Sequence, residues 1–214
     1  MVFNISEHNS IANQFMSELR DVKAQTYRAK FRKNMERLGQ IMAYEISKVL
    51  PFQPAEVITS LGTKHTSLMS EKPVIITVMR AGLPYFQGFV DYFDESDCGF
   101  IGAYRDEGTG EIRISLDYVA APSIDGRIVV LIDPMLATGS SFIRAVNAIT
   151  KYGTPGYIHI ASVVASPQGI QFVEQNLKLP HTIWTCSLDD TLNSQFYIVP
   201  GLGDAGDLSY GEKI

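Results

Sequence analysis

Short apolar runs alternate with segments of helical spacing along most of the chain. Four short apolar runs predict strands: 74–79, 100–104, 129–132 and 157–164. The β-branched run at 129–132 suits a strand that is buried on both faces. A shorter run lies around Ile183, and helical spacing is found at 83–92, 142–152 and 168–177. Because strands that alternate with helices form parallel sheets, the pattern predicts an α/β fold, with a mostly parallel sheet flanked by helices.

The N-terminal helical segment, residues 10–50, carries an apolar stripe at intervals of three and four. Its members are Tyr27, Phe31, Met35, Leu38, Met42, Ile46 and Val49. Pro51 ends the helix, and the stripe indicates either core or a subunit interface. We interpret the basic residues of the same helix as a solvated face in preference to an anion or nucleotide site. These are Arg28, Lys30, Arg32, Lys33 and Arg37.

Two segments depart from the alternation. Residues 51–73 are rich in turn-forming residues and predict one strand and a loop. Residues 105–126 predict a β-hairpin that turns at Gly108 and Gly110. The alternating apolar positions of that hairpin are Ile112, Ile114 and Leu116. The hairpin is either a flap over a site or a plain surface feature.

The composition fits one globular domain, residues 1–214, in which 45% of the residues are hydrophobic and 19% are charged. No apolar run approaches the roughly 20 residues of a membrane span, and the N-terminus lacks an apolar signal segment. We therefore expect a cytoplasmic protein with no membrane contact. Cys98 and Cys186 are far apart and are expected as reduced thiols. A net charge of −5 and a pI of 5.4 argue against nucleic-acid binding.

The sequence VVLIDPMLATGSS, residues 129–141, predicts a strand, a tight turn and a helix N-terminus. Pro134 disfavours helical dihedrals at Asp133, which places this carboxylate at the end of the strand. The backbone N–H groups of such a turn and the helix dipole favour a phosphate group. The carboxylate could hold ribose hydroxyls or a hydrated Mg²⁺ ion. An ordinary capped strand-to-helix turn is the alternative.

Two further segments have compositions suited to ligands. Arg80 directly follows a strand in VMRAGLPYF, where a guanidinium suits a pyrophosphate, although a purely structural arginine is the alternative. The segment FYIVPGLGDAGDLSYG, residues 196–211, predicts an ordered loop whose glycines expose the backbone to a small planar ligand. Its G-x-G-x-x-G pattern is no dinucleotide fingerprint, since a βαβ unit of about 30 residues cannot follow it.

Several of these motifs together resemble the uracil phosphoribosyltransferase family of the type I phosphoribosyltransferases. DPMLATGSS resembles the loop with which that family binds phosphoribosyl pyrophosphate (PRPP), and MRAG and YRDEG resemble its other PRPP segments. YIVPGLGDAGD resembles its uracil-binding signature, and SLDDTLN and VVASPQGI resemble further family segments. The family usually has glycine where this chain has Ser140, and a left-handed conformation there would be harder for serine.

The resemblance implies residue roles. The catalytic residues would be Arg80, Arg105, Asp133 and Asp204. PRPP would be bound by these four and by the loop residues Pro134, Met135, Leu136, Ala137, Thr138, Gly139, Ser140 and Ser141. Uracil would be bound by Ile198, Gly203, Asp204 and Ala205, within a C-terminal uracil-binding segment at 186–214. Mg²⁺ would bind with PRPP, and no residue is assigned to it as a direct ligand.

The resemblance also implies the reaction: uracil and PRPP give UMP and pyrophosphate, in pyrimidine salvage. It implies a homodimer or higher homo-oligomer, with the N-terminal helix as an interface element and GTP as a candidate effector. No dedicated general base is evident, since none of the four histidines lies in these motifs. One alternative is a regulator of the same fold that senses PRPP or UMP, and another is a relative that uses a different base.

Overall fold

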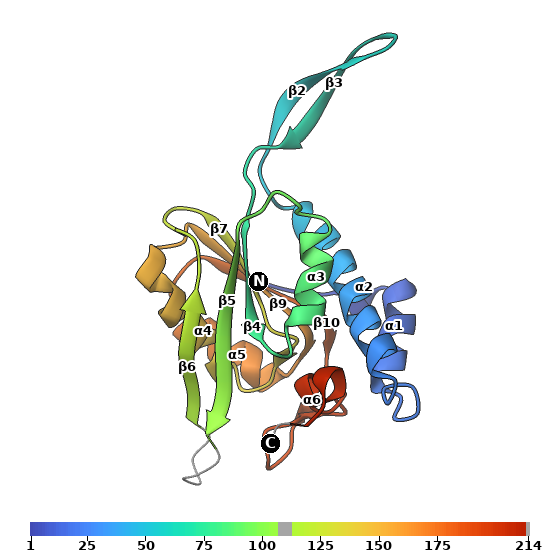
Figure 1. Ribbon diagram of the computed structural model, residues 1–214, viewed down its shortest axis with the longest axis vertical. Helices are drawn as coiled ribbons and strands as arrows, with labels where there is room; N and C mark the ends of the chain where they lie inside the picture. Colours follow the sequence, from blue (N-terminus) through green and yellow to red (C-terminus); the bar gives the residue numbers. More distant parts are fainter. Residues whose placement is uncertain (107–112, 213–214) are drawn as a thin grey trace.

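The computed structural model describes residues 1–106 and 113–212 (Figure 1). At 103–106 and 113–117 it describes the backbone alone. Among the described residues, no helix has the length and apolar character that would let it cross a lipid bilayer.

The central sheet has the strand order β1-β10-β9-β7-β4-β5-β6, with the short β8 paired to β9. Its inner strands are β4 (Val74–Met79), β7 (Ile128–Ile132), β9 (Tyr157–Ala165) and β10 (His181–Leu188), and they run parallel. Their residues are almost all buried, as expected for strands covered on both faces. The predicted fold class and these four strands are therefore confirmed.

Helices cover both faces of this sheet (Figure 1). One face packs against α1 (Ile11–Arg20), α2 (Arg28–Ser47) and α3 (Leu83–Val90), and the other against α4 (Ser140–Ile149) and α5 (Pro167–Asn176). The 3₁₀ turns η1 (Ile5–Glu7) and η2 (Thr150–Tyr152) follow β1 and α4. The predicted helices are thus present, within a few residues of the expected bounds.

The apolar stripe of α2 is core. Phe31, Leu38 and Ile46 are at most 1% exposed and belong to the cluster that packs on the sheet. Helix α3 lies very close to this helix, because a Cβ on Gly39 or Gly88 would come within 2.1 Å of a carbonyl oxygen of the other helix. The core interpretation is therefore confirmed for the buried part of the stripe, whereas Tyr27 and Val49 at its two ends are 70% and 51% exposed. A role of this helix in a subunit interface stays a prediction.

An edge strand at the N-terminus escaped prediction. β1 (Val2–Asn4) pairs in parallel with β10, and the ring of Phe3 stacks on Trp184 with 4.4 Å between the centroids. Three residues are too few to show a periodicity of two. The strand is recognisable only from its pairing with β10, in which the partner residues are 181 positions apart.

Residues 51–73 form a long hairpin arm, in place of the predicted strand and loop. β2 (Phe52–Thr59) and β3 (Gly62–Met69) pair along their whole length and project away from the body (Figure 1). Nearly every residue of both strands is exposed. Without a buried face the arm has no alternation of apolar and polar positions, which is why the sequence indicated only one strand.

The predicted hairpin at 105–126 is in part an extension of the central sheet. β5 (Cys98–Asp106) runs parallel to β4 and then pairs antiparallel with β6 (Arg113–Ala120). Its expected turn, with Gly108, Gly110 and Ile112, lies outside the described residues. The role of this hairpin as a flap stays a prediction.

The C-terminal segment is ordered, as its apolar positions predicted. It contains the short pair β11 (Thr191–Leu192) and β12 (Ile198–Val199), followed by the helix α6 (Ala205–Tyr210). The helix was not expected from the sequence, because six residues of mixed polarity show no helical period. Figure 1 places α6 beyond the end of the sheet opposite the hairpin arm.

Candidate active site

Asp133 lies at the carboxyl edge of the sheet, directly after β7. Its backbone N–H donates to the carbonyl of Ala161, with a distance of 3.2 Å, and its carboxylate accepts from the N–H of Met135 at 3.1 Å. The chain then runs alongside β9 as β8 (Met135–Leu136). Ligands of parallel sheets bind at this edge, so the structure places Asp133 where the sequence predicted it.

The turn into α4 is left-handed at Gly139, where φ is +78°. A Cβ at this position would lie 2.7 Å from the carbonyl oxygen of Gly169, so the backbone and the packing both require glycine. Ser140 is already the first residue of the helix. The concern that serine would resist a left-handed conformation at position 140 is therefore unfounded.

The start of α4 offers polar groups to a ligand. Gly139 is the N-cap residue and has no side chain to bond the first turn of the helix. The hydroxyls of Thr138 and Ser140 lie 3.0 Å apart beside this turn. These groups, with the positive end of the helix dipole, suit a phosphate.

The rest of the predicted PRPP loop serves to hold this turn in place. Leu136 is fully buried in the core, and the carbonyl of Ala137 accepts a hydrogen bond of 2.6 Å from the hydroxyl of Ser166. Ser166 also caps α5 by accepting from the N–H of Gly169 at 2.9 Å. The VVASPQGI segment is therefore a structural support for the loop, as expected.

Arg80 follows β4 at the same edge of the sheet, and its turn packs against the end of β7. A Cβ on Gly82 would lie 2.6 Å from the carbonyl oxygen of Val78 and 3.4 Å from that of Ile132, the residue before Asp133. Glycine at position 82 thus lets the Arg80 turn fold closely against the end of β4, beside the end of β7.

The guanidinium of Arg80 reaches the C-terminal segment. Its Nη2 donates to the Asp207 carboxylate at 3.1 Å and to the carbonyl of Gly211 at 3.2 Å. Its Nε and the nearby Ser209 hydroxyl are buried and have no hydrogen-bond partner in the described part of the chain. Buried polar atoms are usually paired, so these two atoms are exceptions in the contact between the Arg80 turn and α6.

The glycine-rich loop turns at two left-handed residues, Gly201 with φ +60° and Gly203 with φ +93°. Asp204 caps α6 by accepting from the N–H of Asp207 at 2.9 Å. A Cβ on Gly206 would lie 3.8 Å from the Cβ of Ala81, next to Arg80. The structure therefore brings the GDAGD motif and the MRAG motif together.

The predicted uracil contacts differ in exposure. Gly203 is exposed and Asp204 is half-buried. Ile198 and Ala205 are only 4% and 2% exposed and belong to the core cluster, so little of either is accessible to a ligand. The backbone of Arg105 pairs with Ile114, but its side chain lies outside the described residues, so the structure does not place it at the site.

Asp189 is a buried residue of this region that received no role from the sequence. It forms an ion pair with Arg20, with 2.6 Å between the charged atoms. Burial tends to raise its pKa, but hydrogen bonds from Arg20, the Gly201 backbone and Ser187 outweigh burial and hold the pKa below its usual range. Two signals were available for it in the sequence: its position directly after a buried strand and its place in the SLDDTLN segment.

The basic face of α2 is solvated only in part. Arg28, Lys30 and Lys33 are exposed. Arg32 is half-buried and donates to the carbonyl of Ser209 in α6 at 2.7 Å. The interpretation as a solvated face is therefore wrong for Arg32, which attaches the C-terminal helix to the body.

The parallel sheet, the acid and phosphate-type turn at its carboxyl edge and the adjoining arginine turn define the class of the type I phosphoribosyltransferases.

The uracil phosphoribosyltransferase family model matches residues 5–211, and the chain belongs to this family. A uracil phosphoribosyltransferase of Porphyromonas gingivalis is 44% identical over 214 residues, which covers 100% of this chain and 99% of that protein. One of Methanothermobacter thermautotrophicus is 36% identical over 185 residues, or 86% of this chain and 84% of that protein. Among solved structures, the AQ2163 protein of Aquifex aeolicus has a TM-score of 0.87 and 29% identity, with both chains fully covered.

Proposed function

We propose that this chain transfers the phosphoribosyl group of PRPP to uracil, giving UMP and pyrophosphate in pyrimidine salvage. Family membership over nearly the whole chain supports the activity. The contact of Arg80 with Asp207 and Gly211 is the observation that carries it in the structure. Through this contact the Arg80 turn, which suits pyrophosphate, lies beside the C-terminal segment, which suits the base. Transfer of the phosphoribosyl group requires that both substrates be bound next to each other.

Each turn at the carboxyl edge then has a part in binding PRPP. The start of α4, with the Thr138 and Ser140 hydroxyls, would hold the 5′-phosphate, and Asp133 would hold the ribose hydroxyls. Arg80 would contact the pyrophosphate, and Arg105 would join it from the neighbouring hairpin. The carboxylate of Asp133 is held by the N–H of Met135 in a fixed orientation, which favours directional contacts with hydroxyls.

The chemistry calls for positioning and charge stabilisation more than for proton transfer. The bond between the anomeric carbon and pyrophosphate breaks as the uracil nitrogen approaches, with positive charge developing on the ribose. Negative charge accumulates on the leaving pyrophosphate, beside Arg80. Backbone groups around Gly203 would pair with the alternating donors and acceptors of uracil, which explains the glycine-rich composition of the loop.

Mg²⁺ is part of the proposal. The described residues contain no group of three or more His, Cys, Asp or Glu side chains that could hold a metal ion. Mg²⁺ commonly keeps several waters and binds through one or two carboxylates and substrate phosphates, so the single Asp133 carboxylate fits it. When bound, it would neutralise charge on the pyrophosphate.

Incubation of the protein with labelled uracil, PRPP and Mg²⁺ tests the activity. We expect labelled UMP and release of pyrophosphate. Cytosine, hypoxanthine and guanine in place of uracil serve as controls for the base. Failure to form UMP at saturating substrates would refute the enzyme and favour a regulator, whereas faster turnover of another base would favour a relative of altered specificity.

We also propose a homo-oligomer in which the hairpin arm contacts a second copy. The arm leaves the body at the end opposite α6 (Figure 1). Its tip exposes large apolar side chains, with Ile58 at 87% and Leu61 at 98% exposure. A two-stranded hairpin is marginally stable by itself in water, so an arm of this length needs a partner surface.

GTP as an effector and a cytoplasmic location complete the proposal, and both rest on the family. In α2, Lys30 and Lys33 form ion pairs with Glu18 and Glu36, while Arg28 is exposed near Gly211. We therefore propose Arg28 as the basic residue of this helix best placed for an anionic effector. Titration of GTP into the UMP assay with wild-type protein and Arg28→Ala tests this, and equal responses would contradict it.

A further inference from the structure

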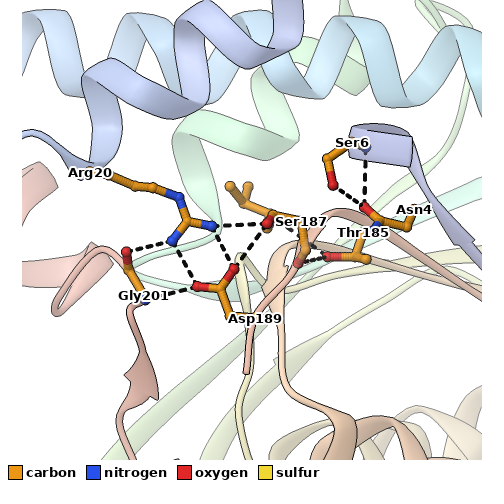
Figure 2. Close-up of polar contacts among 8 residues, drawn as sticks. Asn4, Ser6, Arg20, Thr185, Ser187, Asp189 and Gly201 are labelled. Carbon is orange, nitrogen blue, oxygen red and sulfur yellow. Dashed lines mark hydrogen bonds and ion pairs between the residues drawn. The ribbon is translucent and has the colours of Figure 1, made fainter. Parts of the chain in front are cut away.

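Arg20 and Asp189 form a two-pronged ion pair at the base of the glycine-rich loop (Figure 2). Arg20 is the last residue of α1, and Asp189 directly follows β10. Nη1 of Arg20 donates to Oδ2 of Asp189 at 2.7 Å, and Nη2 donates to Oδ1 at 2.6 Å. The Asp189 side chain is 3% exposed and that of Arg20 is 24% exposed.

The pair holds the backbone of one loop residue, Gly201, on both sides of its Cα. The N–H of Gly201 donates to Oδ2 of Asp189 at 2.8 Å, and the carbonyl of Gly201 accepts from Nη1 of Arg20 at 2.7 Å. The hydroxyl of Ser187 accepts from Arg20 and donates to Asp189, at 2.9 Å in each case. Figure 2 shows Arg20 and Asp189 each reaching Gly201, with Ser187 between the two charged groups. Every hydrogen-bonding group of Gly201 is thus fixed by side chains from other elements.

Gly201 is a sensitive point at which to hold the loop. It is left-handed, with φ +60°, and a Cβ there would lie 2.1 Å from the carbonyl oxygen of Ile198. It stands two residues before Gly203 and three before Asp204. A shift of the Gly201 peptide therefore moves the backbone that would face the base.

We propose that Arg20 and Asp189 are positioning residues that set the uracil affinity of this loop; the inference rests on the proposed function. Backbone donors and acceptors cannot adopt a new rotamer, so a ligand that is recognised by backbone depends on how precisely the chain is held. Displacement of a positioned group by about 1 Å can cost about 100-fold in rate. PRPP would be bound mainly by turns that Arg20 does not touch, and Asp204 is the one PRPP contact in this loop, so PRPP binding should change much less than uracil binding.

Arg20→Lys is the informative variant. Lysine keeps the charge, but a single ammonium cannot reproduce the planar fork that serves Asp189, Ser187 and Gly201 together. We expect the KM for uracil to rise about tenfold or more, with the KM for PRPP within about twofold of wild type. A merely structural role would lower the active fraction, and so kcat, without changing either KM.

Arg127→Lys is the matched control. Arg127 pairs with Asp97 at 2.6 Å, just before β7, at the opposite edge of the sheet from Asp133. The same substitution there should leave both KM values within about twofold. An unchanged uracil KM in folded Arg20→Lys, or an equal rise in both KM values, would overturn the positioning role.

Ser187→Ala covers the case in which Arg20→Lys does not fold. It removes one hydroxyl from the network and retains the ion pair, so a rise of about threefold in the uracil KM alone is expected. An unchanged uracil KM in this variant would likewise overturn the proposal. Wild-type protein that makes no UMP would overturn the proposed function, whereas unchanged KM values in an enzyme that makes UMP overturn only the role of Arg20 and Asp189.

Discussion

At the scale of single residues, the neighbours Gly139 and Ser140 differ in which substitutions their backbone conformation allows. Gly139 is left-handed and pressed against the Gly169 carbonyl, while its neighbour Ser140 is an ordinary first residue of a helix. Several residue types therefore fit at position 140 without backbone strain. At position 139 a residue with a Cβ would be strained.

We predict opposite outcomes for two substitutions in this turn. Gly139→Ala should raise the KM for PRPP at least about tenfold and destabilise the fold by about 1–2 kcal/mol, because a left-handed alanine is strained. Ser140→Gly, the matched control, should change the KM for PRPP by less than about threefold. Steady-state kinetics and urea unfolding measure both effects, and an equal rise in the KM for PRPP in the two variants would contradict this difference between the positions.

His159 makes stability depend on pH. It is 4% exposed, it accepts a hydrogen bond from the Trp184 indole at 3.1 Å, and burial lowers its pKa from 6.5 to about 4. The unfolded chain binds a proton near pH 6.5 and the folded chain only near pH 4. The stability from neutral His159 is therefore full above pH 6.5 and is lost as the pH falls to 4.

His159→Asn, which keeps an acceptor for the Trp184 indole, should remove this dependence. Between pH 7 and pH 4, wild type should lose up to about 3 kcal/mol more unfolding free energy than the variant. Urea unfolding at several pH values measures the difference. Parallel pH profiles for the two proteins would contradict the role of His159.

At the scale of elements, the C-terminal helix and the hairpin arm differ in how firmly they are attached to the body of the chain. Helix α6 is attached by Arg32 and by Arg80 and is held at its start by the Asp204 cap. The hairpin arm has no such attachment along its strands, since nearly all of its residues are exposed. Helix α6 is therefore a fixed part of the site. The arm is expected to be held by a partner surface and not by the body of its own chain.

A change at the tip of the arm should affect assembly and leave the body intact. Ile58→Lys combined with Leu61→Lys should lower the molar mass measured by light scattering, because two charges oppose burial of the tip. The circular dichroism of the body should not change. Val22→Lys, which replaces an apolar side chain that is 74% exposed on the body, is the control. An unchanged mass for the tip variant would argue against an interface there.

At the scale of the whole molecule, the sheet order assembles the site from distant parts of the chain. Strands β4 and β7 are adjacent, so the turns that follow them lie side by side at one edge. The C-terminal segment closes over the same edge through Arg80. A ligand that bridges these turns should stabilise the entire fold.

We predict a rise in melting temperature with PRPP that depends on Mg²⁺. At about 100 times its Kd a ligand adds about 2.7 kcal/mol, which for a chain of this size is about 5–10 °C. EDTA should remove more than half of this shift and should not change the melting temperature of the protein alone. Differential scanning fluorimetry measures both, and a shift that EDTA leaves intact would contradict a role for Mg²⁺ in PRPP binding.

Much of the fold was accessible from local patterns. The strands at 74–79 and 129–132 and the helix at 168–177 appear nearly where periodicity placed them. The hairpin arm was only half recognised, because its two strands are exposed on both faces and show no alternation. Strand β1 was missed since a three-residue strand has no period of its own.

The sequence by itself determined the features that residues close together in the chain create. These are the alternation of strands and helices, the acid and phosphate-type turn at 133–141, and the glycine-rich loop at 196–211. Local dihedral preferences and periodicity are sufficient for these. Only the tertiary structure decided which loops meet. Arg20 is 169 positions from Asp189, and Arg80 is 127 positions from Asp207. No local pattern encodes such contacts, because they arise from strand order and core packing.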